Sequence, residues 1–117
     1  MNKYLDSGPD DAIRRFILLV LLQAQQDNAT ELIVGLASPD GVTIRYQVEG
    51  AWYELAPFPA RIRREVVSEL ARLAGFRAGN FPGEGVLNES LGNVRLRWTV
   101  AMTSVDSECK LRKEVES

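Results

Sequence analysis

The sequence contains no histidine and only one cysteine, Cys109. Histidine is the commonest general base and metal ligand, so its absence excludes a Ser-His-Asp triad, a Cys-His pair and a zinc site built on imidazole. A single cysteine excludes an internal disulfide, and the chain gives no sign of a secreted, disulfide-built fold. We therefore expect no catalytic residue, no cofactor and no metal.

Long apolar runs and an excess of positive charge are also missing. The longest apolar run, residues 16–22, has seven residues, whereas a membrane span needs about 18 to 20. The net charge is −2, whereas a protein that binds duplex DNA is usually basic. We expect a cytoplasmic protein that neither inserts into a membrane nor binds nucleic acid.

The length and composition are those of one globular domain. The chain has 117 residues, of which 45% are hydrophobic and 26% charged, a balance that favours a folded chain over a disordered one. We expect a single domain over residues 1–117, with an ordered core from about 10 to 113.

Two segments have the apolar spacing of helices. Residues 10–26 are apolar almost all round, which predicts burial on more than one side, against a sheet and either a helix or a partner chain. Residues 60–74 place Val66 and Leu70 on one inner face. The apolar first helix also leaves a homodimer open.

The other segments alternate as strands do. The alternation is clearest in residues 42–49 and 94–101, and turn residues separate further short strands at 31–37, 52–55, 86–91 and 109–112. Residues 76–85 hold three glycines and predict a loop. The pattern predicts an α+β fold with two main helices and an antiparallel sheet of about five to six strands, in the order α-β-β-β-α-β-β-β. The helices are expected to cover one sheet face, leaving a polar face or an interface.

Four arginines are predicted to share the sheet face opposite the core. They alternate with apolar residues in their strands, and they are Arg45, Arg95, Arg97 and Arg112. Two interpretations remain open. The arginines form a contact surface for phosphate, acidic peptide or partner carboxylates, or they form a solvated face with cross-strand pairs to Glu49 or Glu89.

The aromatic, acidic and thiol side chains allow further predictions. Trp98 falls in the apolar register of its strand and is expected in the core, whereas either Trp52 or Tyr53 must face outward, since strand neighbours point to opposite faces. An exposed aromatic there is a candidate interface residue. Cys109 is expected to be a buried, inert thiol. Three glutamates are expected to be surface carboxylates without acid-base roles: Glu84, Glu89 and Glu108.

Several segments, in order, resemble the small domain that precedes the motor in type II secretion and type IV pilus ATPases. Residues 42–50, VTIRYQVEG, look like that family's "VRVRYRIDG" hairpin, and residues 66–75, VVSELARLAG, are similar to its "IVSRLKVLAG" helix. Residues 18–33 resemble the helix leading into its "ASDIHIE" strand, residues 81–85 its "LPQDG", and residues 94–112 its "VDLRVSTLPTVHGEKVVLRL". The likeness spans about residues 13 to 112.

The resemblance implies a PAS-like domain that packs on the motor of a neighbouring subunit in a hexameric ring. In that family, arginines of the domain can approach the neighbour's nucleotide, and Arg45, Arg97 and Arg112 match such arginines by position. The departures are substantial. Residues 31–35 lack the histidine and acid of "DIHIE", Gln47 replaces an arginine, and Arg95 replaces an acid. None of the nine glycines is followed by lysine, so the chain has no P-loop and no Walker-type ATP hydrolysis of its own.

These observations predict a non-catalytic protein-interaction domain that binds or regulates a partner assembly, with a motor ATPase as the first candidate partner. The residues expected at a partner or phosphate contact are Arg45, Arg97, Arg112 and Trp52. The alternative is a small acidic chaperone of the type III secretion kind. This chain resembles those chaperones in size, acidity and the order of helices and strands, and such a chaperone would bind an extended peptide. A PAS-like small-molecule sensor requires an internal pocket.

Overall fold

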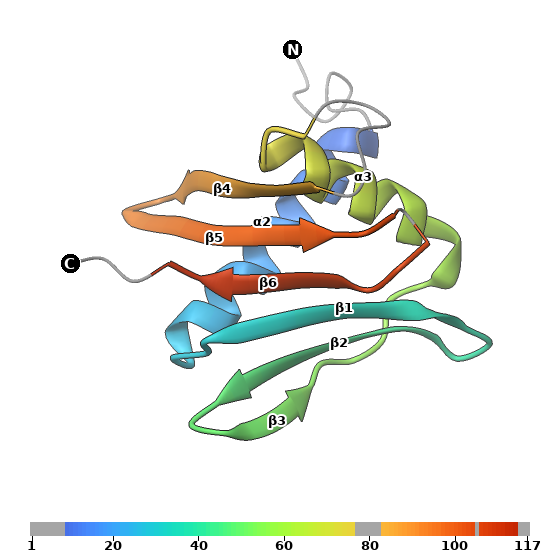
Figure 1. Ribbon diagram of the computed structural model, residues 1–117, viewed down its shortest axis with the longest axis horizontal. Helices are drawn as coiled ribbons and strands as arrows, with labels where there is room; N and C mark the ends of the chain where they lie inside the picture. Colours follow the sequence, from blue (N-terminus) through green and yellow to red (C-terminus); the bar gives the residue numbers. More distant parts are fainter. Residues whose placement is uncertain (1–8, 77–82, 105, 115–117) are drawn as a thin grey trace, which may run out of the picture.

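The computed structural model describes residues 9–76, 83–104 and 106–114. Within them lie two α-helices and one six-stranded sheet (Figure 1). In chain order the elements are α2 (Pro9–Gln26), β1 (Glu31–Ser38), β2 (Gly41–Val48), β3 (Ala51–Glu54), the 3₁₀ turn η1 (Ala60–Ile62), α3 (Arg63–Leu73), β4 (Gly83–Leu91), β5 (Val94–Met102) and β6 (Cys109–Lys113). The predicted α+β class and the order α-β-β-β-α-β-β-β are confirmed.

The sheet joins an N-terminal and a C-terminal group of three strands. Its strand order is β3-β2-β1-β6-β5-β4, and every neighbouring pair is antiparallel. The two groups meet where β1 pairs with β6, with Leu32 opposite Leu111 and Val34 opposite Cys109. All four of these side chains are buried, so the seam between the groups lies in the core.

Both helices cover the same face of the sheet, as expected (Figure 1). α2 packs against β5, β4 and α3, as predicted for a helix that is apolar on nearly all sides. Leu19 of this helix is nevertheless 50% exposed. Trp98 is fully buried in this layer, as predicted. The largest side chains buried between sheet and helices are Trp98, Leu21, Leu32, Leu87 and Leu96. None of the helices in the described ranges is long and apolar enough to cross a membrane.

The predicted hairpin between the second and third strands is confirmed. Val48 pairs with Ala51, and the two residues between them, Glu49 and Gly50, have φ angles of 51° and 84°. Two successive positive φ angles define the type I′ turn whose twist suits a two-residue hairpin, and glycine reaches the second of them without strain. The turn fixes the register that places Trp52 opposite Gln47.

The loop predicted over residues 76–85 is wrong at its C-terminal end, because Gly83–Gly85 belong to β4. Its residues 77–82 lie outside the described ranges. Gly85 is needed for a close approach and not for a turn: a Cβ placed there would lie 2.1 Å from the carbonyl oxygen of Ala74, at the end of α3. The glycine therefore lets α3 end directly against β4.

Arg63 is a buried residue that the sequence analysis missed. The predicted second helix starts as the 3₁₀ turn η1 and becomes α-helical at Arg63, which is only 7% exposed. Its Nε donates a hydrogen bond to the carbonyl oxygen of Gly35 at 2.8 Å, and its Nη2 donates to that of Ser107 at 2.7 Å. The guanidinium thus ties α3 to β1 and to the turn between β5 and β6.

We predict that Gly85→Ala destabilises the fold. The added methyl group must displace the Ala74 carbonyl, which we expect to cost about 2 kcal/mol of unfolding free energy. Urea unfolding followed by circular dichroism measures the effect. Asn88→Ala, at an exposed position of the same strand, is the matched control and should change stability by less than about 0.5 kcal/mol. Equal unfolding midpoints for the two variants would contradict the close approach.

Candidate functional site

The face of the sheet opposite the helices, here called the open face, carries all four predicted arginines. Across β2, β1 and β6, Arg45 is opposite Ile33, and Ile33 is opposite Lys110. Lys110 is in turn opposite Ala101 of β5. Residues paired across strands point to the same face, and so do alternate residues of one strand. Since Arg112 pairs with Thr99, the same rule adds Arg112, Arg97 and Arg95. The prediction of one shared face is confirmed.

Trp52 and Arg45 form a contact at the β3 end of the open face. The guanidinium carbon of Arg45 lies 5.8 Å from the centroid of the Trp52 ring, a cation–π arrangement, and Arg45 Nη2 lies 3.6 Å from Glu108 Oε2. Trp52 is 43% exposed. Tyr53 points to the helix side and is also exposed, because β3 is the edge strand. Of these two neighbours, Trp52 is therefore the one that presents its ring beside the arginines.

The cross-strand pairs predicted for this face are wrong. Glu89 is opposite Leu96, a core residue, and so lies on the helix side. There its Oε1 accepts a hydrogen bond from Arg14 Nη2 at 2.6 Å. Glu49 is in the β2–β3 turn. Among the described residues, Arg95, Arg97 and Arg112 make no ion pair with any carboxylate.

The open face is hollowed along β5 and β6. One hollow of about 630 Å³ lies near the β5–β6 turn, between Glu84, Glu108 and Lys110. A second, of about 290 Å³, shares Glu84 and Lys110 with it and reaches Arg112. The two hollows are therefore adjacent, and together we call them the open-face groove.

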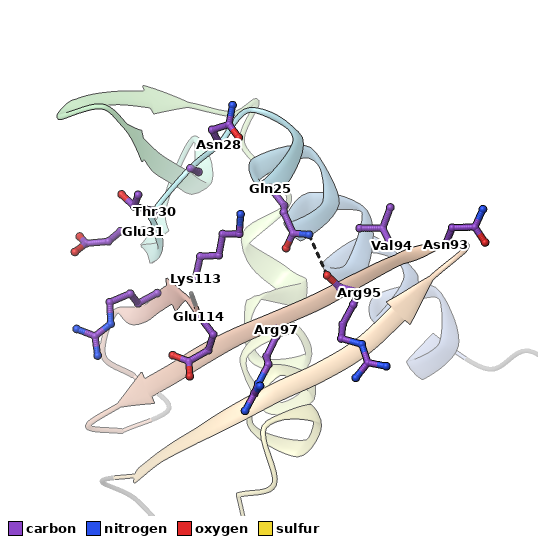
Figure 2. Close-up of a pocket in the computed structure, with 12 residues that line it drawn as sticks. Gln25, Asn28, Thr30, Glu31, Asn93, Val94, Arg95, Arg97, Lys113 and Glu114 are labelled. Carbon is purple, nitrogen blue, oxygen red and sulfur yellow. Dashed lines mark hydrogen bonds between the residues drawn. The ribbon is translucent and has the colours of Figure 1, made fainter. Parts of the chain in front are cut away.

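A larger hollow of about 870 Å³ adjoins this groove at the end of β6 and shares Glu31 and Arg112 with it. We call it the basic groove. Figure 2 shows its residues coming from the end of α2, the start of β1, the start of β5 and the end of β6. Its charged residues are Arg95, Arg97, Arg112, Lys113, Glu31 and Glu114. Sequence reasoning missed Lys113, Gln25 and Glu114, because only the strand order brings these segments together.

The three glutamates considered for acid-base chemistry are not gathered in one place. Glu84 and Glu108 line the hollow near the β5–β6 turn, whereas Glu89 is on the opposite face. In the part of the chain that the structure describes, no group of three or more acidic or cysteine side chains is placed to hold a metal ion.

The interior offers little room for a ligand. The cavity between α2, α3 and the sheet, lined by residues such as Phe16, Val66 and Leu111, has a volume of about 20 Å³. Since roughly 10 to 15 Å³ of such volume is enough for one water molecule, the cavity has room for about one. This cavity does not supply the pocket that a small-molecule sensor requires.

Comparison of the chain with models of known protein families and with curated proteins found no match. The likeness to the pre-motor domain of secretion and pilus ATPases therefore stays a prediction, based on the order and spacing of short segments.

We predict that Cys109 does not react in the folded protein. Its side chain is fully buried, and burial raises the pKa of the thiol to about 12. At pH 8 its thiolate fraction is then about a thousandfold below that of a free thiol. The reaction of the folded chain with an aromatic disulfide reagent, followed by absorbance, should proceed only as fast as the chain unfolds, and the urea-unfolded chain should react at once. Reaction of the folded chain at the rate of a free thiol would contradict the burial.

Proposed function

We propose that this chain is a non-catalytic protein-interaction domain that binds a partner protein on the open face of its sheet. The observation that carries the proposal is the one-sided architecture. Both helices cover one sheet face. The other face carries the open-face groove, an exposed tryptophan and three arginines, Arg95, Arg97 and Arg112, without ion pairs among the described residues.

A polar outer face is common on antiparallel sheets, so exposure alone does not indicate binding. Three features go beyond it. The face is hollowed, Trp52 is exposed beside Arg45, and arginine and tryptophan are the side chains enriched at interface hot spots. In addition, Arg97 and Arg112 form no ion pair within the described ranges. A partner protein that brings carboxylates to this face would form ion pairs with both arginines.

The resemblance described above narrows the class of partner. In secretion and pilus ATPases the similar domain packs on the motor of a neighbouring subunit. We propose that this chain is a relative of that domain in the cytoplasm, and that it binds or regulates a motor ATPase or a related assembly. Arg45, Arg97, Arg112 and Trp52 are then the contact residues. No catalytic group, cofactor or metal enters this proposal.

A capture experiment tests the proposal. The tagged chain, Arg45→Glu/Trp52→Ser and a control, Arg61→Glu/Leu19→Ser, are each used to capture proteins from the native lysate. The control also reverses one arginine and removes one exposed apolar side chain, but outside the open face. We expect the unaltered chain and the control to retain a motor ATPase, and the open-face variant to retain at least about tenfold less.

The other outcomes are also informative. Equal recovery with the open-face variant would contradict the use of the open face. Recovery of an exported substrate in extended form, bound to a stable dimer of this chain, would overturn the proposal in favour of the chaperone alternative.

A further inference from the structure

The basic groove lies where the sheet is incomplete. β6 ends at Lys113, which pairs with Trp98, whereas β5 begins at Val94. Beyond the end of β6, the first residues of β5 therefore face the α2–β1 connection across an opening and not across a strand (Figure 2). The opening is bounded on that far side by Asn28 and Thr30.

The charges that line the groove are unbalanced. Four are positive and two are negative, so the groove carries a net charge of +2 (4 − 2). None of the four cations makes an ion pair with any residue in the described ranges. Of the two acids, Glu114 is already engaged, because its Oε2 accepts a hydrogen bond from Thr99 Oγ1 at 2.5 Å.

The arginines are held at a regular spacing. Arg95 and Arg97 are alternate residues of β5, so their side chains leave the same face about 6.6 Å apart along the strand. The strand is fixed at this point: Gln25 Nε2 donates a hydrogen bond to the carbonyl oxygen of Arg95 at 3.0 Å, and the backbone nitrogen of Glu114 donates to that of Arg97 at 3.0 Å. These contacts hold one edge of β5, and its other edge pairs with β4, where Ser90 is opposite Arg95 and Asn88 is opposite Arg97.

An extended peptide repeats its side chains at the same interval as a β-strand. Two carboxylates at alternate positions of such a peptide match the spacing of Arg95 and Arg97, and each guanidinium offers a planar fork that suits a carboxylate. We infer that the basic groove binds an extended acidic segment of the partner protein, with acidic residues at alternate positions. This inference rests on the proposed function and specifies the chemistry of the partner.

Fluorescence anisotropy with labelled peptides tests the inference on the full chain. One peptide carries two glutamates at alternate positions, its isomer carries the same glutamates side by side, and a third carries glutamines. At low salt we expect the alternating peptide to bind roughly tenfold more tightly than the neutral one and more tightly than its isomer, because adjacent side chains of an extended peptide point to opposite sides.

Matched variants locate the binding. Arg95→Gln/Arg97→Gln should weaken the alternating peptide about tenfold and abolish its advantage over the isomer. Arg61→Gln/Arg64→Gln removes the same charge from exposed positions outside the groove and should change binding less than about twofold. Equal affinity for the two isomers, or equal effects of the two double variants, would overturn the inference. So would inorganic phosphate displacing the peptide at a concentration below that at which the peptide binds, because the groove would then be a phosphate site.

The outcome is separable from that of the proposed function. If Arg95→Gln/Arg97→Gln still retains the partner while Arg45→Glu/Trp52→Ser loses it, the acidic-segment inference fails and the open-face function stands. If both variants retain the partner, both proposals fail.

Discussion

The pairing of β1 with β6 holds this fold together, because it is the contact that turns two groups of strands into one sheet. It joins Leu32 to Leu111 across most of the length of the chain, and closing so long a loop costs entropy that local hairpins do not pay. Burial of Leu32, Val34, Cys109 and Leu111 at the seam offsets that cost. Arg63 of α3 stabilises the same region, because its guanidinium donates hydrogen bonds to the carbonyl oxygens of Gly35 and Ser107.

The seam also positions the candidate binding surface. It sets Arg112 beside Glu31 and, through the β5–β6 pairing, opposite Thr99, so that arginines from both halves of the chain share the open face. Because β6 is only five residues long and β5 has nine, the sheet opens where β6 ends. The basic groove is therefore a consequence of unequal strand lengths at the seam, and the charges that line it come from segments far apart in the sequence.

The strands, the helices, the β2–β3 hairpin and the shared face of the arginines could be predicted from the sequence, because each depends on local periodicity or turn chemistry. The burial of Trp98 followed from the same periodicity. Strand order could not be predicted, and with it the basic groove, since the partners of β6 are chosen by burial across the whole chain. The sequence predicts Gly85 to lie in a loop, because the role of this glycine, the close approach to Ala74, depends on tertiary packing. Arg63 was missed because sequence patterns do not separate a buried arginine from its exposed neighbours.

The central claim is that the open face, and not the helical face, meets the partner. Amide chemical shifts of the isotopically labelled chain, recorded with and without the captured partner, test this most directly. The account predicts shifts for the amides of residues 28–31, 93–97 and 110–113 and the indole of Trp52, with little change at Leu19, Arg61 and Arg64. Shifts concentrated on α2 and α3, with the open face unchanged, would contradict it.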